Sequence, residues 1–112
     1  MGVITSLSQS MYLTSYINSL KSQLTDAMDM QRGLMKEVSQ LTSEITDIGN
    51  NDSPAVKQLK ARQAELEVLD KQLQLRIKNI QTQLEAANVE LQSADQMLQR
   101  DTQTSCRYGL GG

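Results

Sequence analysis

EITDIGNNDSPAVKQL, residues 44–59, contains the clearest break in a chain that otherwise follows one apolar repeat. Gly49 is suited to the left-handed conformation that ends many helices. Asp52 or Ser53 can cap a following helix, and Pro54 fits its first turn, because no backbone donor is needed there. The stretch therefore predicts a helix that ends near Ile48, a turn, and a second helix.

Outward from the break, apolar residues recur at alternating steps of three and four, which is typical of a coiled-coil seam. Before the break the repeat comprises Leu13, Ile17, Leu20, Leu24, Ala27, Gln31, Leu34, Val38, Leu41, Ile45 and Ile48. After the break it comprises Val56, Leu59, Gln63, Leu66, Asp70, Leu73, Ile77, Ile80, Leu84, Ala87, Leu91, Ala94 and Leu98.

The two repeats mirror each other about the break. If the chain folds back on itself, Ile45 faces Leu59 and Leu24 faces Ile80, with no shift of register between them. The fold class predicted is all-α, a long antiparallel α-helical hairpin (coiled coil) that packs laterally with other subunits. A parallel coiled coil of one continuous helix is the alternative, and both the break and the mirrored register argue against it.

We expect a single domain built from this hairpin. Its predicted parts are arm one over about 3–48, a turn over 49–54, arm two over 55–103 and a tail over 104–112. The phase of the repeat slips between Met11 and Leu13, which predicts a bend or a stutter near the start of arm one.

Three members of the predicted seam are polar: Gln31, Gln63 and Asp70. Asp70 falls in the layer of Leu34 and could pair with Arg32 across the hairpin. One interpretation is a polar residue that fixes the register or contacts a partner. The other, which we favour, is a solvated carboxylate on the open edge of the seam, with Leu69 taking the apolar role.

A second set of apolar residues lies off the seam. Val68, Leu75 and Val89 follow seven-residue steps on arm two, and such strips on a soluble surface typically mark an interface. Scattered surface apolar residues are the alternative. The predicted assembly interface comprises Val3, Ile4, Leu7, Met11, Tyr16, Met28, Met35, Val68, Leu75, Val89 and Tyr108.

Composition excludes most other functions. The chain has no His, Trp or Phe, a net charge of −2, and bases interspersed with acids, so we expect no enzyme activity, metal site, cofactor or nucleic-acid binding. The lone Cys106 excludes an internal disulfide. No stretch is apolar enough for a transmembrane helix, and the start lacks the basic leader of a secretory signal peptide.

The uncharged Ser- and Gln-containing start (residues 5–20), the turn Asn50–Ala55 and the Gln-rich second arm together resemble the small axial subunits of type III secretion needles and the helical core of flagellar filaments. The resemblance implies hairpins stacked into a hollow tube, and an uncleaved export signal in the Ser-rich start. The chain is longer than a usual needle subunit and ends in a Gly-rich stretch. The size also resembles the WXG100 group, but no Trp precedes Gly49.

Two functions follow as expectations. The first is a structural subunit that self-assembles into a helical filament or tube, extracellular or at the cell surface, with a secretion apparatus or chaperone as a possible partner. The alternative is a helical-hairpin binding module, such as an adaptor, a chaperone or a WXG100-like secreted protein, that works as a small oligomer with a partner and could be cytoplasmic. Apolar residues on both arms favour the polymer.

Overall fold

The computed structural model describes residues 2–49 and 52–111, and their side chains as far as Cys106. It confirms the all-α helical hairpin: α1 spans Val3–Ile48 and α2 spans Pro54–Gly111. Asn50 and Asn51, in the predicted turn, lie outside the described residues. The described backbone contains no strand.

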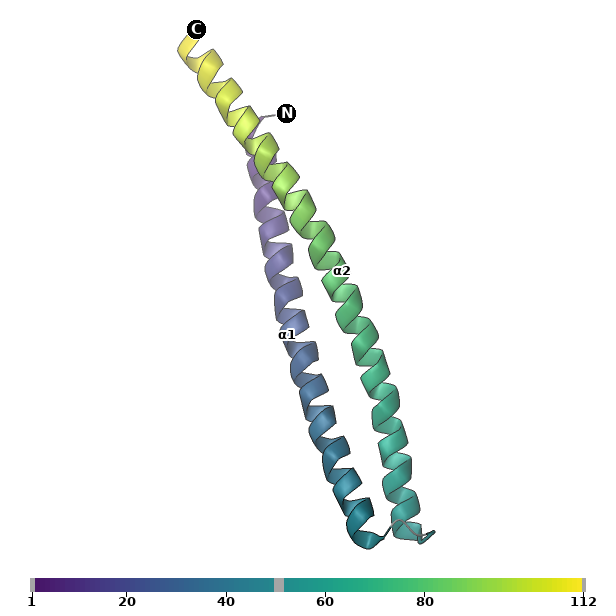
Figure 1. Cartoon of the computed structure of the whole chain (residues 1–112). Coiled ribbons are helices and arrows are strands. Elements are labelled where there is room, and N and C mark those ends of the chain that lie inside the picture. Colours follow the sequence, from purple (N-terminus) through teal and green to yellow (C-terminus); the bar gives the residue numbers. More distant parts are fainter. Residues whose placement is uncertain (1, 50–51, 112) are drawn as a thin grey trace. The chain divides into compact units, whose positions relative to one another are not determined.

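Contacts divide the chain into two units, each containing a part of both helices. The loop unit comprises Leu24–Asn79, and the terminal unit comprises Met1–Gln23 with Ile80–Gly112. In the loop unit one helix segment leads into the turn and the other begins directly after it, so the two run antiparallel (Figure 1). In the terminal unit the start of α1 lies beside the later part of α2 (Figure 1).

The turn uses the residues that the sequence indicated. Gly49 adopts a φ of 99°, which favours glycine, and its N–H donates to the carbonyl oxygen of Ile45 at 3.1 Å. The hydroxyl of Ser53 accepts a hydrogen bond from the N–H of Val56 at 3.3 Å, so Ser53 rather than Asp52 caps α2. Ile48 is 43% exposed, because the seam ends one layer earlier, at Ile45.

The loop unit buries the seam between its two helices. Ala27, Leu73 and Ile77 form one buried cluster, with Leu24 and Leu34 packed against it. Ala27 and Ile77 were expected to share a layer, so this cluster has the predicted register. The other buried apolar residues of this unit also belong to the predicted repeats: Leu41, Ile45, Val56 and Leu66.

The terminal unit continues the same spacing with smaller and more polar residues. Its buried residues are Leu13, Ile17 and Leu20 on α1, and Ile80, Ala87 and Ala94 on α2. Between Val3 and Leu13 the seam positions are occupied by Ser6 and Ser10, which stand at steps of three and four. The predicted stutter near Met11 is therefore wrong, since the repeat stays in phase and only its chemistry changes.

Two hydrogen bonds join the helices at these serines. The Ser6 hydroxyl, 3% exposed, donates to a carboxylate oxygen of Asp101 at 2.5 Å, and the Ser10 hydroxyl donates to Asp95 at 2.7 Å. Hydroxyl–carboxylate bonds of this length are charge-assisted and stronger than neutral ones. The polar start of α1 is thereby fixed against α2 without a large apolar side chain.

The end of α2 differs from the prediction. The helix was expected to stop near residues 100–104, but it continues to Gly111, so most of the predicted tail is helical. No Gly or Pro occurs between Ala55 and Tyr108 to end it. The start of α2 also differs by one residue, because Pro54 is its first helical residue.

Cysteine cross-linking tests the register. In a Cys106→Ser background, Ala27→Cys with Ile77→Cys should form an intramolecular disulfide, because bridged α-carbons must lie within about 7 Å. Ala27→Cys with Leu66→Cys is the control, since these positions lie three turns apart along the hairpin. Non-reducing gels and mass spectrometry measure the products. Efficient bridging of the control pair, or bridging only between chains, would contradict the hairpin register.

Candidate assembly surfaces

Asp70 occupies a seam position in the loop unit and is half-buried. Its carboxylate accepts hydrogen bonds from the side-chain amide of Gln31 across the hairpin at 3.3 Å and from that of Gln74 at 2.8 Å. Arg32 instead pairs with Asp29 at 3.5 Å, and Leu69 is exposed. Leu69 therefore does not fill the layer, and Arg32 does not pair with Asp70. The carboxylate keeps its seam position, where it is partly exposed and accepts hydrogen bonds from two side-chain amides.

Gln63, the third polar seam residue, donates from its side-chain amide to the Thr42 hydroxyl at 3.0 Å. Every polar residue of the predicted seam is therefore satisfied by a partner on the opposite helix or one turn away. No buried polar side-chain atom lacks a partner in the described part of the chain. The polar layers thus avoid the desolvation cost of unpaired groups.

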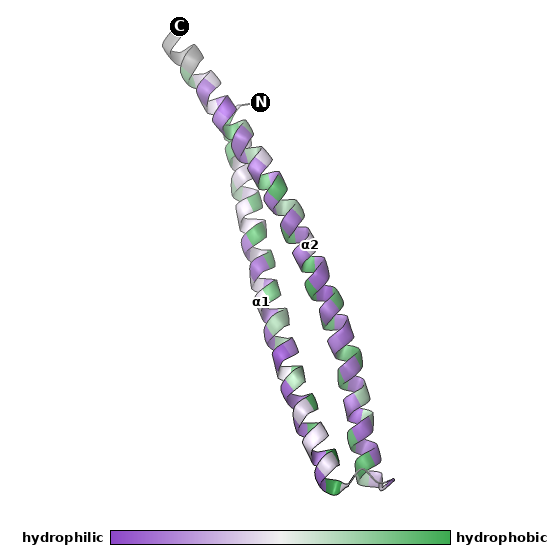
Figure 2. Ribbon diagram, viewed as in Figure 1, coloured by the Kyte–Doolittle hydropathy of each residue, from purple (hydrophilic) through white to green (hydrophobic). Residues whose placement is uncertain are grey.

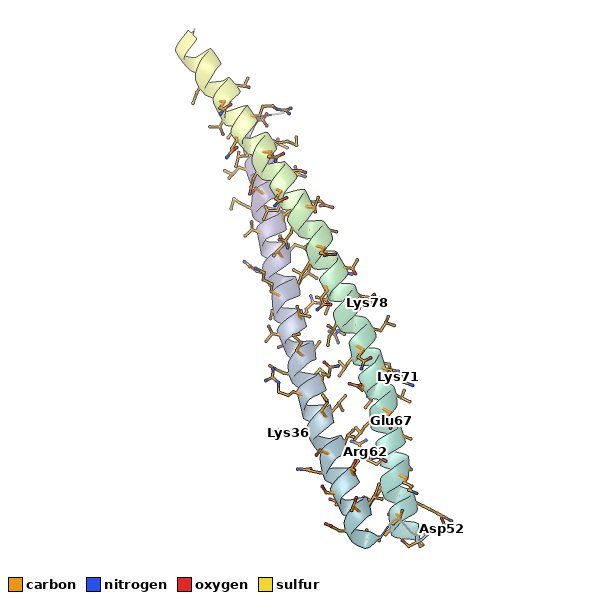
Figure 3. The ribbon with its side chains drawn as sticks, viewed as in Figure 1. Lys36, Asp52, Arg62, Glu67, Lys71 and Lys78 are labelled. Carbon is orange, nitrogen blue, oxygen red and sulfur yellow. The ribbon has the colours of Figure 1, made fainter. Side chains whose placement is uncertain are left out.

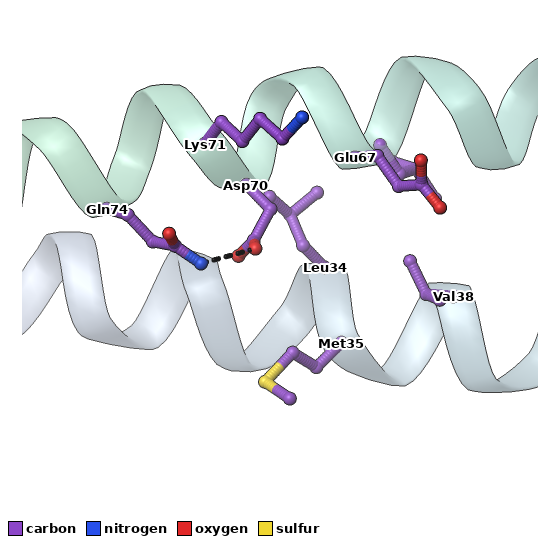
Figure 4. A pocket seen from close by; sticks show the side chains of 8 residues that line it. Leu34, Met35, Val38, Glu67, Asp70, Lys71 and Gln74 are labelled. Atoms are coloured by element: carbon purple, nitrogen blue, oxygen red, sulfur yellow. Dashed lines mark hydrogen bonds between the residues drawn. The ribbon is translucent and has the colours of Figure 1, made fainter.

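A groove of about 330 Å³ opens beside the Asp70 layer on one edge of the loop unit. Figure 4 shows Leu34 and Val38 of α1 on the side toward α2, where Asp70 and Gln74 lie, whereas Met35 lies on the side of α1 away from α2 in this view. Leu66, Glu67 and Lys71 complete its lining. A carboxylate is smaller than the Leu side chain that a seam usually holds, so this layer leaves the sides of Leu34 uncovered.

A second groove, of about 460 Å³, lies on the other edge of the same unit. Leu34 lines this groove as well as the first one. The remaining lining residues come from both helices: Met30, Gly33, Leu69, Gln72, Leu73 and Arg76. One under-filled layer is therefore flanked by an apolar groove on each edge.

Arg62 forms the main ionic contact between the helices of the loop unit. Its guanidinium lies 3.0 Å from Glu37 of α1 and 2.9 Å from Glu65 of α2. Hydrogen bonds from Glu65 and then Glu37 raise the pKa of Arg62 above its ordinary value. All three side chains are substantially exposed, so the contact aligns the helices and adds little to the stability of the fold.

The outer faces of the two helices differ in chemistry. In heptad notation, with the seam at positions a and d, position f points away from the partner helix. On α1 this position holds Ser8, Ser15, Ser22, Asp29, Lys36 and Ser43. On α2 it holds Ala61, Val68, Leu75, Thr82 and Val89, followed by the polar residues Gln96 and Gln103.

The large members of the α2 outer stripe are well exposed. Val68 is 56% and Leu75 61% exposed in the loop unit, and Val89 is 64% exposed in the terminal unit. Figure 2 shows that apolar residues occur along both helices between hydrophilic ones. The side chains of Val68 and Leu75 in the loop unit, and of Val89 in the terminal unit, are therefore apolar surface that the seam does not cover.

The start of α1 presents another apolar surface in the terminal unit. Ile4 is 81% exposed, and Leu7 and Met11 are also exposed on the same part of the helix. Val3, expected beside them, takes a seam position and is half-buried. Tyr12 and Tyr16 stack on each other with ring centroids 6.3 Å apart, and both rings remain exposed.

The other predicted interface residues, Met28 and Met35, are exposed, whereas the Tyr108 side chain lies outside the described residues. The predicted interface omitted the exposed apolar residues Tyr12, Met30, Leu69 and Met97. The last three fall at heptad position g, directly beside the seam. Scanning position g on both arms would have found them.

Chemical sites are sparse in the described part of the chain. No group of three or more potential metal ligands occurs among the residues searched, and Cys106 is an exposed thiol. None of the described helical stretches combines the length and the hydrophobicity that crossing a bilayer requires. No protein-family model, curated protein or solved structure matches the chain.

Replacing Asp70 by Leu tests the polar layer. We expect the free energy of unfolding to rise by about 1–3 kcal/mol, because a Leu side chain buries apolar surface that the carboxylate does not. Asp70→Asn is the control and should change stability much less, since it keeps the shape. Urea unfolding followed by circular dichroism at low protein concentration measures both. A less stable Asp70→Leu variant would show that the Gln31–Asp70–Gln74 network outweighs apolar filling.

Proposed function

We propose that this chain is a structural subunit that assembles with copies of itself into a helical filament or tube. The observation that carries the proposal is the apolar outer face of α2, where Val68, Leu75 and Val89 stand opposite the seam. In a two-helix coiled coil that works alone, this face contacts only water and is normally polar. The matching face of α1 has that polar character.

The number of exposed apolar surfaces supports a polymer over a simple dimer. A dimer needs one self-complementary patch, whereas a polymer needs at least two different ones. The described residues offer the outer face of α2, the two grooves of the loop unit, and the Ile4–Met11 surface of the terminal unit. In a monomer, apolar patches on several faces stay in contact with water, which is unfavourable in free energy.

The second candidate function is a binding module for one different protein. The groove beside Met35 favours it, because an apolar cleft between two helices can hold an amphipathic helix of a partner. This function needs one surface and predicts a discrete complex of fixed size. Sizing the purified protein over a range of concentrations separates the two functions, since a polymer grows with concentration.

We propose further that the assembled protein is extracellular or at the cell surface, and that a secretion apparatus or a chaperone handles the subunit before assembly. The support is the resemblance of the uncharged, Ser-containing start to the export segments of needle and flagellar subunits. A cytoplasmic location is the alternative. Fractionation of cells that express the protein, with and without residues 2–11, tests this part separately from assembly.

Leu75→Asp tests the outer face of α2. Because Leu75 is exposed, we expect the hairpin to stay folded, while a carboxylate buried without a partner at the contact blocks assembly. Ser22→Asp, at the same heptad position on α1, is the control and should assemble normally. Light scattering and negative-stain microscopy measure assembly, and circular dichroism measures folding. If wild type and Leu75→Asp form the same particles, this face is not an interface.

Ile4→Gln with Met11→Gln tests the start of α1. These substitutions leave the Ser6–Asp101 and Ser10–Asp95 bonds in place, so we expect a normal hairpin whose assembly is weakened or lost. The matched control is Thr5→Gln with Ser8→Gln, two exposed polar positions on the same turns. Polymerisation of purified Ile4→Gln/Met11→Gln protein at wild-type concentration would remove this surface from the contact and leave export as the better account of these residues.

A further inference from the structure

The two edges of the loop unit are distinct surfaces with defined residues. Heptad positions e and b of both helices form one edge, and positions g and c form the other. The two grooves confirm this division, because Met35, Glu67 and Lys71 line the first and Met30, Leu69 and Arg76 line the second. The Arg62–Glu37 pair joins two g positions on the second edge.

The first edge is basic. Lys71 and Lys78 follow each other along α2 at a seven-residue step (Figure 3). Glu67, one helical turn before Lys71, is the acidic residue of this edge. The basic residues at positions e and b of this unit are Arg32, Lys57, Lys60, Lys71 and Lys78. We call this surface the basic edge.

The second edge is acidic. Its basic residues are Arg76 and Arg62, and Arg62 pairs with Glu37 and Glu65. The basic edge likewise contains one paired residue, Arg32, which pairs with Asp29. The acidic residues at positions g and c of this unit are Asp26, Glu37, Glu44, Asp47 and Glu65. We call this surface the acidic edge. The loop unit therefore separates charge across its width, although the net charge of the whole chain is only −2.

Each edge has an apolar centre at the same height. Leu34 lines both grooves, with exposed Met35 on the basic edge and exposed Met30 and Leu69 on the acidic edge. Gly33 lies in the acidic-edge groove, and a Cβ added there would meet nothing within 4 Å. Glycine inside a helix costs stability relative to alanine, so the hairpin alone does not account for Gly33. A close approach by a second copy, as proposed below, would account for it.

We propose that the basic edge of one copy packs against the acidic edge of the next, with the two apolar grooves in register. Opposite charge on two edges of the same unit makes each copy complementary to a second copy, whereas two like edges would repel. The contact is heterologous, so it leaves one free edge of each kind and continues to a further copy. The inference rests on the proposed self-assembly and names the surfaces that produce it.

Charge reversal on each edge tests the pairing. The basic-edge variant carries Lys57→Glu, Lys60→Glu and Lys71→Glu, and the acidic-edge variant carries Asp26→Lys and Glu44→Lys. All five positions are exposed, and these substitutions leave the Arg62 pairs untouched. Each variant alone should lose assembly, because its two edges then have the same sign. An equal mixture should assemble again, since each variant supplies the edge that the other needs.

A chain carrying all five substitutions is the folding control, because it restores opposite edges and should assemble by itself. Lys36→Glu, on the outer face of α1, is the control for charge alone and should behave as wild type (Figure 3). Light scattering and negative-stain microscopy at low and high salt measure assembly. Wild-type assembly should weaken with salt, because exposed charges are screened.

The outcomes separate this inference from the proposed function. If wild type assembles while either single-edge variant assembles equally well alone, or while the mixture of both stays dispersed, the edge pairing is wrong and self-assembly stands. If wild type stays monomeric at every concentration and salt level tried, the proposed function and this inference both fail. Recovery in the mixture and in the five-substitution chain supports the pairing.

Discussion

Each helix in this fold has one neighbour, and every other feature depends on that constraint. A helix in a larger bundle can bury two or three faces, but here only the a and d positions are covered. Each layer of the seam therefore consists of two residues, one from each helix. A layer has few contacts beyond its immediate neighbours, so its packing depends mainly on its own pair. Anything apolar outside those two positions contacts water until another molecule covers it.

The Asp70 layer links the seam to the surface. Its carboxylate is held by Gln31 and Gln74, which gives the two helices a polar contact at one defined height. Because Asp70 is small and polar at a position where a seam usually holds a large apolar side chain, Leu34 stays open toward both edges. The polar Asp70 layer that fixes the register of the seam therefore also creates the two surface grooves. Both grooves would close if a large apolar side chain filled this layer.

The amino-acid sequence predicted the hairpin, its turn and most of its buried residues because the 3-4 spacing is carried by large aliphatic side chains such as Leu66 and Ile77. The prediction from sequence was wrong where seam positions hold polar side chains in place of large aliphatic ones. Ser6 and Ser10 hold seam positions, but a search for apolar residues passes over serine and finds Ile4 and Met11 on the next face. A serine is recognisable as a seam residue only when its acidic partner on the other helix is known.

The end of α2 and the exposed edges were harder to predict for a different reason. Helix propensity in residues 100–111 is ordinary, so neither a stop nor a continuation is strongly encoded. Met30 and Leu69 each look like isolated surface residues in the linear sequence, and only the antiparallel pairing brings them to one groove. The grooves are thus properties of the pairing, which explains why the outer stripe on α2 and Met35 on the basic edge were predicted, whereas Met30 and Leu69 on the acidic edge were not.

The connection at Gly49–Ser53 also sets an order of folding. Sequence separation between paired residues grows steadily away from it, from 21 for Thr42 and Gln63 in the loop unit to 95 for Ser6 and Asp101 in the terminal unit. Because closing a longer loop costs more entropy, we expect the loop unit to form its contacts first and the terminal unit to form them last. A chain whose two ends are held apart can then still form the loop unit, whereas the contacts of Ser6 and Ser10 form only when the ends come together.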